Sequence, residues 1–467
     1  MSPGPVRLLL NRVMKLQLRR DVIVLTTPVF FEQLFVNLLG IVNTIMAARV
    51  SREAVSAIGM VDAINQIILA LFSALAIGAT VVVAQCYGRG EHLRAGKAML
   101  QATVSCTLLA VSLGALAILM RKPLLAMLYG NPGALVETYM QDYLLITALS
   151  YPLTALTLVI SGALRGAGET RMAMQANTLM NVANVILGYV LIYGMHLRTQ
   201  WLDIHVAPHG VIGAACAISL ARLAGALYLL YALRRHRHLL PARLRGFRFD
   251  TTLLRPIFAI GIPSGIESLV FNGGKLLVQI MVVGMGTAAV AASFIGFSIS
   301  TLLNIPGNAL AVALTTLVGQ SIGRRDERRA ENDMWYVLCL ATALMTSIGM
   351  VCWPLARWFV GLYSQDAEII ALGSHLVQLN CLFLVVWPAT FVLPNGLKGA
   401  GDARYAMVTT LIGMCAFRIL LGYVFGVMFE WGVTGVWLGM FADWLIRSTL
   451  YLARFSRGHW KGRQLIA

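Results

Sequence analysis

Twelve long apolar stretches constrain this chain more than any other feature of its sequence. Each has close to, or more than, the ~20 residues that an α-helix needs to cross the hydrocarbon core of a bilayer. Charged residues make up only 12% of the 467 residues, whereas soluble domains carry about 25%. We therefore predict an all-α polytopic membrane protein with twelve transmembrane helices, at 22–48, 57–87, 98–120, 137–164, 172–195, 211–232, 256–283, 290–322, 334–356, 368–397, 405–428 and 433–453.

The distribution of Lys and Arg predicts how these helices are oriented. With the N-terminus in the cytoplasm, 27 of the 37 Lys and Arg residues fall in cytoplasmic segments, six in external loops and four inside spans. This asymmetry follows the positive-inside rule and predicts that both termini are cytoplasmic. It also explains the net charge of +17, which in a soluble protein would indicate a nucleic-acid partner. We expect the basic loops to contact membrane lipids and no nucleic acid.

Neither end of the chain nor its cysteines indicate processing or metal binding. Residues 1–21 lack the short apolar core and the cleavage site of a signal peptide, so we expect the first span to be an uncleaved helix. The seven cysteines lie in or at the ends of spans without the spacing of metal ligands. We expect no metal site.

A basic motif occurs twice in the chain. VAQCYGRGEHLRA at 83–95 and VGQSIGRRDERRA at 318–330 are identical at six of thirteen positions. GALRGAGETRMAM at 162–174 likewise matches NGLKGAGDARYAM at 395–407. Because both copies of the first motif are basic, they belong on the same side of the membrane, and an even number of spans must separate them. The chain is therefore predicted to be a duplicated six-helix unit with parallel repeats, a construction found in secondary transporters.

The duplication sets the predicted domain boundaries. They are a cytoplasmic segment at 1–21, an N-lobe at 22–232, a basic linker at 233–255, a C-lobe at 256–453 and a cytoplasmic tail at 454–467. The glycines and basic residues of the repeated loops suit tight turns, orientation and contact with lipid headgroups. No GxxxxGK[ST] motif is present, so we do not expect this chain to bind and hydrolyse ATP.

Two glutamates inside spans are the strongest functional candidates. Glu32 and Glu267 occupy equivalent positions of the repeat, each four residues after a proline, Pro28 or Pro263. An ionisable residue within a span indicates a functional site, and we predict that these glutamates couple transport to an ion. The alternative is that both are structural groups that hold neighbouring helices together. An ion pair between Glu267 and Lys275, eight residues later, would keep the glutamate ionised.

Further polar residues within spans are candidates for lining a substrate cavity. Each could also form an ordinary hydrogen bond between helices. Few of them are acidic, and the interior cations hint at an anionic or zwitterionic cargo, unless those cations pair with Asp443 or reach the interface. The candidates are Asn37, Asn43, Asp62, Asn181, Asn184, Asn272, Lys275, Gln279, Asn304 and Arg418.

These motifs together resemble the multidrug and toxic compound extrusion (MATE) family over essentially the whole chain. The resemblance rests on the basic loop at 83–95, the GALRGAGET and GLKGAGDAR segments, and NTIMAARVS at the end of the first span. GIPSGIESLVFNGGKLLVQ and WGVTGVWLGMFADW look most similar to the bacterial branch that contains YeeO. The resemblance implies a bacterial inner-membrane antiporter in which two lobes form a V-shaped central cavity and rock between outward- and inward-facing states. Such a protein exports drugs or metabolites, flavins in some members, against H⁺ or Na⁺.

The chain departs from the pattern of this family at three positions. Asn43 stands where many relatives carry an acidic residue, Gly188 where a second polar residue of the fifth helix is common, and Phe271 where some relatives carry a cation-binding glutamate. The resemblance then implies that coupling has moved to Glu32 and Glu267, or that it uses Na⁺ at another cluster of oxygen ligands. We expect the protein to bind a small-molecule substrate and to be a monomer. Besides the transported ion, we expect no cofactor.

Three other classes of protein agree less well with the sequence, and a fourth, related class remains an alternative. The loop of a major facilitator transporter has a G-x₃-D-[RK]-x-G-[RK] pattern, which neither GRGEHLRA nor GRRDERRA fits. A channel needs a continuous polar stripe, and an enzyme needs a nucleophile–base pair or a metal cluster; the scattered polar residues and the loop histidines supply neither. A lipid or lipid-linked oligosaccharide flippase of related architecture remains the alternative to an antiporter.

Overall fold

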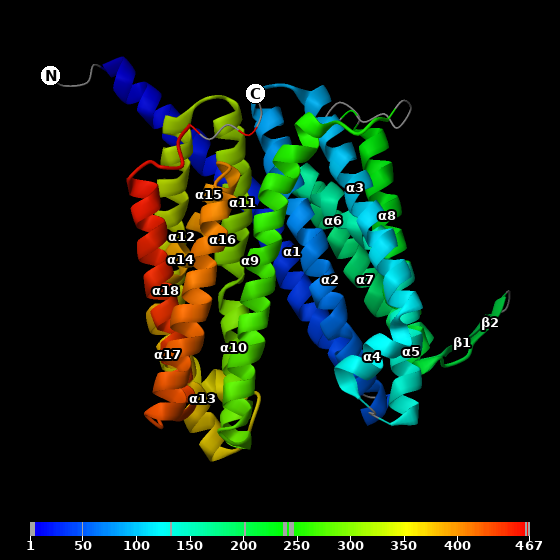
Figure 1. Ribbon diagram of the computed structural model, residues 1–467. Helices are drawn as coiled ribbons and strands as arrows, with labels where there is room; N and C mark the ends of the chain where they lie inside the picture. The colour runs from blue at the N-terminus through cyan, green and yellow to red at the C-terminus, as the bar shows by residue number, and fades with distance from the viewer. Residues whose placement is uncertain are drawn as a thin grey trace. The chain divides into compact units, whose positions relative to one another are not determined.

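The computed structural model describes residues 5–48, 50–130, 133–199, 202–236, 241, 247–462 and 465, and it is almost entirely helical (Figure 1). The first half contains α1 (Pro5–Ala48), α2 (Arg52–Gly88), α3 (His92–Leu119), α4 (Arg121–Tyr129), α5 (Ala134–Leu149), α6 (Tyr151–Ala167), α7 (Thr170–Tyr193) and α8 (Gly210–Arg235). The second half contains α9 (Thr251–Val283), α10 (Thr287–Leu303), α11 (Ile305–Gly323), α12 (Glu327–Gly361), α13 (Ala367–Phe383), α14 (Trp387–Phe391), α15 (Leu393–Gly399), α16 (Ala403–Ile412), α17 (Leu420–Tyr423) and α18 (Gly432–Ser456), with π-helical turns η1 (Gly413–Ile419) and η2 (Val424–Met428).

The predicted all-α membrane fold is confirmed by these helices. In the described part of the chain, nine helices are long and apolar enough to cross a membrane, and two bent helix pairs raise that number to eleven. The twelfth predicted span corresponds to α18, which is 25 residues long but carries Asp443 and Arg447 inside it. These two charged residues lower the hydropathy of α18, although they neutralise each other within the protein.

Several predicted spans are broken helices, and the breaks follow from their sequences. The span at 137–164 bends by 47° between α5 and α6, and the span at 368–397 bends by 75° between α13 and the segment Trp387–Gly399. Pro152 and Pro388 lie at the start of the second helix of each pair. A proline lacks the backbone N–H that would continue the hydrogen-bond ladder, so it suits the first turn of a new helix. The span at 290–322 breaks in the same way, with Pro306 in the first turn of α11.

A small β-hairpin is an addition to the predicted all-α fold. Strands β1 (Met195–Thr199) and β2 (Leu202–Val206) pair antiparallel between α7 and α8, with Met195 opposite Val206. The hairpin projects beyond the helical ends beside it (Figure 1). A two-stranded ribbon is compatible with a membrane protein only where water or other polar groups satisfy its edges, which fits a loop outside the bilayer.

The helices form two compact units, which we describe separately. The N-terminal unit comprises Phe31–Val83 and Glu91–Gly261, and the C-terminal unit comprises Met1–Phe30, Ala84–Gly90 and Ile262–Ala467. Helices α1 and α9 therefore contribute to both units, and each changes unit within three residues of its proline. The membrane lobes at 22–232 and 256–453 remain a prediction, since these units are defined only by which residues pack together.

Apolar side chains fill the core of each unit. In the N-terminal unit, Ala57 and Val61 of α2 pack in one cluster with Leu144 of α5. In the C-terminal unit, α12, α13, α14 and α18 pack together (Figure 1), and the ring of Phe383 in α13 stacks on that of Phe441 in α18 with centroids 4.3 Å apart. Lipid tails are as apolar as these side chains, so close packing and polar contacts, not the hydrophobic effect, hold such helices together.

The repeated basic motif marks a close helix contact within the C-terminal unit. Gly88 ends α2 and Gly323 ends α11. A Cβ atom on Gly88 would overlap the carbonyl oxygen of Gln320, and a Cβ atom on Gly323 would overlap that of Gln85. These four residues are equivalent in pairs in the repeat, so each copy of the motif supplies both the glycine and the carbonyl that the other copy contacts. Gln85 also donates from Nε2 to the carbonyl oxygen of Gly399, at 3.2 Å.

We expect Gly88→Ala to destabilise the protein, because the new methyl group has only backbone to displace. Overpacking of this kind typically costs about 1–3 kcal/mol. The measurement is the thermal midpoint of the detergent-purified protein, followed by size-exclusion fluorescence. Gly59→Ala on the same helix is the control, since a Cβ atom at Gly59 meets nothing within 4 Å. Equal midpoints for the two variants would contradict the close contact.

Candidate functional site

Glu32 lies in a buried polar cluster of the N-terminal unit. It belongs to α1 and is only 4% exposed. It forms an ion pair with Arg165, which is in the last turn of α6. Asn177 of α7 donates from Nδ2 to the same carboxylate oxygen, Oε1, at 2.5 Å. One glutamate thus connects three helices.

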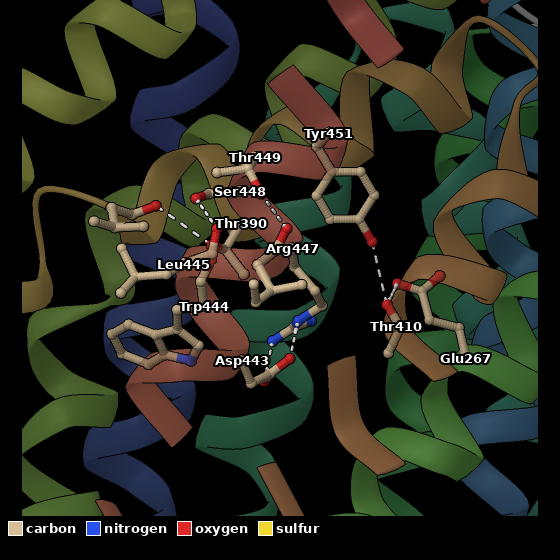
Figure 2. A network of polar contacts seen from close by, with 12 residues as sticks. Glu267, Thr390, Thr410, Asp443, Trp444, Leu445, Arg447, Ser448, Thr449 and Tyr451 are labelled. Carbon is tan, nitrogen blue, oxygen red and sulfur yellow. Dashed lines mark hydrogen bonds and ion pairs between the residues drawn. The ribbon is translucent and has the colours of Figure 1, made fainter. Parts of the chain in front are cut away.

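Glu267 has a matching environment in the C-terminal unit. It belongs to α9, and its side chain is 16% exposed. Lys398, in the last turn of α15, places Nζ 2.7 Å from Oε2. Thr410 of α16 donates from Oγ1 to Oε1 at 3.5 Å, and its hydroxyl lies 3.2 Å from the hydroxyl of Tyr451 (Figure 2). Glu267 is therefore paired with Lys398, and the alternative pairing with Lys275 does not occur in this structure.

The two clusters are copies of one arrangement. Glu32 and Glu267 are 235 residues apart, and the two partner pairs, Arg165 with Lys398 and Asn177 with Thr410, are each 233 residues apart. In both units, an acid from a proline-containing helix meets a cation from the repeated Gly-rich segment and a polar residue from the following helix. The duplication of the sequence is thus a duplication of a buried acid–base contact. We name these two clusters the paired-acid sites.

The cations of the paired-acid sites were not among the predicted site residues. Sequence reasoning assigned Arg165 and Lys398 to orientation and lipid headgroups, because each ends a span beside glycines. In the structure both side chains turn to a glutamate of their own unit. The signal that could have identified them is their shared offset, which is the offset of Glu32 and Glu267 to within two residues.

A second polar cluster in the C-terminal unit surrounds Phe271 of α9. Lys275 places Nζ 4.6 Å from the centroid of the Phe271 ring, and the guanidinium carbons of Arg418 and Arg447 lie 5.5 and 5.7 Å from it. Arg447 also binds Asp443 through two hydrogen bonds of 2.7 and 2.9 Å within α18 (Figure 2). The predicted site residues Lys275 and Arg418 are therefore brought together, although they are far apart in the sequence. We name this group the Phe271 cluster.

Asp62 lies in a polar group of the N-terminal unit. Its Oδ1 accepts from Asn65 at 3.2 Å and from the hydroxyl of Tyr143 at 3.4 Å. Within the same unit, Arg222 donates to the hydroxyl oxygen of Ser150 at 2.6 Å and is buried. These contacts connect α2 with α5, and α8 with the junction of α5 and α6, as expected of polar residues that join helices.

Several predicted amides are satisfied along their own helices. Asn37, Asn181 and Asn272 each donate to the carbonyl oxygen four residues earlier, at 2.8–2.9 Å. Such a bond uses the donor locally, but it leaves the side-chain oxygen available to another partner. Asn304 lies at the junction of α10 and α11, where its Oδ1 is buried without a hydrogen-bond partner among the described residues.

The remaining predicted residues do not join either cluster through a described contact. Gln279 is exposed on α9, and Asn184 is partly buried on α7. Asn43 belongs to α1, but its side chain lies outside the described residues. The roles predicted for these three residues remain predictions. Among the described residues, no group of three or more His, Cys, Asp and Glu side chains could hold a metal ion.

Apolar helices with a duplicated buried acid–base contact define a polytopic membrane protein built from two equivalent halves. The chain belongs to the MatE family, which matches it twice, over residues 28–190 and 263–424. The probable multidrug resistance protein NorM of Thermotoga maritima is 26% identical to it over 453 residues, covering 96% of this chain and 95% of that protein. The multidrug resistance protein PmpM of Pseudomonas aeruginosa is 24% identical, covering 90% and 87% of the two chains.

Solved structures have the same fold. An outward-facing multidrug resistance MATE family transporter of the MOP superfamily superimposes with a TM-score of 0.85 and 22% identity, over 94% of this chain and 96% of that one. A MATE protein solved in complex with MaL6 gives a TM-score of 0.84 and 20% identity, over 94% and 97%. The predicted family is therefore confirmed, and the protein is a multi-pass membrane transporter and not an enzyme. Its place within the YeeO-containing branch stays a prediction.

We expect Arg165→Leu to destabilise the N-terminal unit, because it leaves the Glu32 carboxylate buried without its cation. Breaking a buried ion pair costs about 3–5 kcal/mol, and the lower value applies here because the Arg165 side chain is 21% exposed. The double variant Glu32→Gln/Arg165→Leu should regain part of the loss. Thermal midpoints in detergent measure both effects.

Arg171→Gln is the control for this experiment, since Arg171 lies in the same sequence motif but is exposed. It should leave the midpoint nearly unchanged. A midpoint for Arg165→Leu equal to that of Arg171→Gln would show that the ion pair contributes nothing to stability.

Proposed function

We propose that this protein is a secondary active antiporter that exports small organic compounds across the bacterial inner membrane in exchange for H⁺ or Na⁺. The proposal includes alternating access of a central cavity between two lobes. The observation that carries it is the pair of paired-acid sites, one in each unit. An acid buried next to a single cation is a group whose protonation changes the interactions that hold helices together.

The physical argument starts from the cost of an unpaired buried charge. Protonation of Glu267 removes its negative charge and leaves Lys398 buried without a counter-ion, which disfavours the paired arrangement. α9 would then be released from α15 and α16. The equivalent event at Glu32 would release α1 from α6 and α7, so binding of a proton would loosen the same junction in each half.

The contacts of Glu267 support H⁺ more than Na⁺ as the coupling ion. A hard cation needs several oxygen ligands at short range, and the described oxygens beside Glu267 are those of Thr410 and Tyr451. The ammonium group of Lys398 already occupies the carboxylate at 2.7 Å, and it would repel Na⁺. A proton needs no additional ligands, and it binds once Lys398 has moved away from the carboxylate, because the ion pair itself keeps Glu267 ionised.

Drug-like compounds are the proposed cargo. The relatives that match over nearly the whole chain are named multidrug resistance proteins, and this supports export of xenobiotics over the flippase alternative. The paired-acid sites agree with either, because both kinds of transporter have to change the contacts between helices.

We expect Glu267→Gln to reduce transport driven by a pH gradient by about tenfold or more, a size typical of coupling between two sites. The amide cannot carry the proton. Purified protein in liposomes is tested with an imposed pH gradient, and separately with a Na⁺ gradient, against a panel of dyes and drugs. Binding of the same compounds without a gradient should be retained.

Glu53→Gln is the matched control, since Glu53 is an exposed acid in the first turn of α2. It should transport like the wild type, whereas Glu32→Gln should fall between the wild type and Glu267→Gln. Full coupling in both the Glu32 and Glu267 variants would mean that the glutamates are structural. Transport driven by Na⁺ alone would replace H⁺ as the coupling ion.

Both termini are proposed to be cytoplasmic, and the protein is proposed to work as a monomer. The support for the orientation is the 27-to-6 distribution of basic residues between cytoplasmic and external segments. A fusion of alkaline phosphatase to the C-terminus should be inactive and a fusion of a fluorescent protein should fluoresce, because only the cytoplasm permits the second result. The reverse pattern would contradict the orientation.

A further inference from the structure

We propose that the Phe271 cluster binds the acidic group of the transported compound, so that the cargo is an aromatic organic anion or zwitterion with a carboxylate, sulfonate or phosphate group. This inference rests on the proposed function in that it assigns a substrate class to the same transporter. It concerns residues of the C-terminal unit alone: Phe271 and Lys275 of α9, Arg418 of η1, and Asp443 and Arg447 of α18.

The charges of the cluster do not balance. Three cations approach the ring of Phe271, each with its charged group within 5.7 Å of the ring centroid. The carboxylate of Asp443 pairs with Arg447. Among the described residues, Lys275 and Arg418 form no ion pair, and the Asp443 carboxylate, which also attracts Arg418, is already bound to Arg447. Two positive charges in a region of low dielectric repel each other unless an anion joins them.

Arg418 gives the strongest evidence for an anion-binding site. The residue is 3% exposed, and its Nη1 is buried without a hydrogen-bond partner among the described residues. A guanidinium group has five N–H donors in a planar fork that matches the oxygens of a carboxylate or phosphate. Burying such a group without a partner is costly, and an acidic group of a ligand would supply the acceptor.

The backbone around Arg418 is shaped to bring these groups together. Arg418 lies in the π-helical turn Gly413–Ile419, and turns of this kind often occur at functional sites. A Cβ atom on Gly413 would overlap Oδ1 of Asp443 and would lie 2.7 Å from the side chain of Arg447. Only glycine therefore allows η1 to approach the ion pair of α18 this closely. Lys275, by contrast, is an exposed residue on α9, where a ligand can reach it.

The partly exposed rings of Phe271 and Phe391 provide a surface for the rest of the ligand. They meet edge to face with centroids 5.9 Å apart, and the buried rings of Trp387 and Trp444 pack behind Phe391. The cations above the Phe271 ring are stabilised by its π-electrons, which reduces the cost of holding them together before a ligand binds. The acidic group of the proposed ligand would thus bind the cations of the cluster, and its aromatic part would pack on the neighbouring rings.

The test compares two dyes with the same aromatic skeleton and opposite charge. Fluorescein is anionic at neutral pH, and rhodamine 123, whose carboxyl group is a methyl ester, is cationic. Their binding to the purified full-length protein in detergent is followed by fluorescence anisotropy, without any ion gradient. We expect the wild type to bind fluorescein at least about tenfold more tightly than rhodamine 123.

Two substitutions then locate the site. Lys275→Gln should weaken fluorescein binding about tenfold and leave rhodamine 123 binding unchanged or stronger. Arg418→Gln should have the same effect, and because Lys275 is exposed, its variant remains informative if the buried Arg418 variant fails to fold. Arg404→Gln is the control, since Arg404 is an exposed cation of the same unit, and it should bind both dyes like the wild type.

The outcomes separate this inference from the proposed function. Preference of the wild type for rhodamine 123, or equal losses for both dyes in Lys275→Gln, would overturn the anion site. Gradient-driven transport of cationic dyes alone would leave the antiporter standing and refute this substrate class. Binding of fluorescein that depends on Lys275, without transport under any gradient, would support the site and refute the antiporter.

Discussion

Within a bilayer, an ionised side chain has no water to stabilise it and needs a counter-charge from the protein. This requirement organises the polar interior of both units. Glu32 is held by Arg165, Glu267 by Lys398, and Asp443 by Arg447. The first two pairs each connect two helices, and the third lies within α18. The first two therefore help to determine where the helices of a unit meet. In the proposed mechanism the coupling ion and the cargo act on these few contacts, because the apolar contacts around them do not respond to protons or to charge.

The duplication is retained in one set of charges and lost in the other. Both halves contain an acid, a cation and a polar partner at equivalent positions, as expected if each half responds to the same ion. The Phe271 cluster occurs in one half only. The position of Arg418 corresponds to Asn184 in the first half, and that of Lys275 corresponds to Gly40. On the proposals made above, the paired-acid sites couple both halves to the same ion, whereas the Phe271 cluster of one half recognises the charge of the cargo.

Glycine has a related role in the contacts that the repeat makes. The helix ends at Gly88 and Gly323 approach each other's motif so closely that no side chain fits between them. The same is true of Gly413 beside the ion pair of α18. In a membrane, where close backbone approach replaces the hydrophobic effect as a source of helix association, small residues decide which helices can touch. The repeated basic motif at 83–95 and 318–330 therefore provides close helix packing as well as positive charge.

The membrane fold, the two halves and the two glutamates as candidates could be predicted from the sequence. A bilayer imposes helices of a minimum length and excludes charges from them, so apolar runs, basic loops and isolated acids can be recognised without a structure. The ion-pair partners of the charged residues became known only from the packing of the helices. Lys275 lies on the same helix as Glu267, yet Lys398 from another helix forms the ion pair. A cation at the end of a span can turn to headgroups or to the bundle, and an amide can bond to its own helix, as Asn37, Asn181 and Asn272 do. These choices differ little in local energy, and they are settled by which helices pack together, a property of the whole fold and not of any one segment.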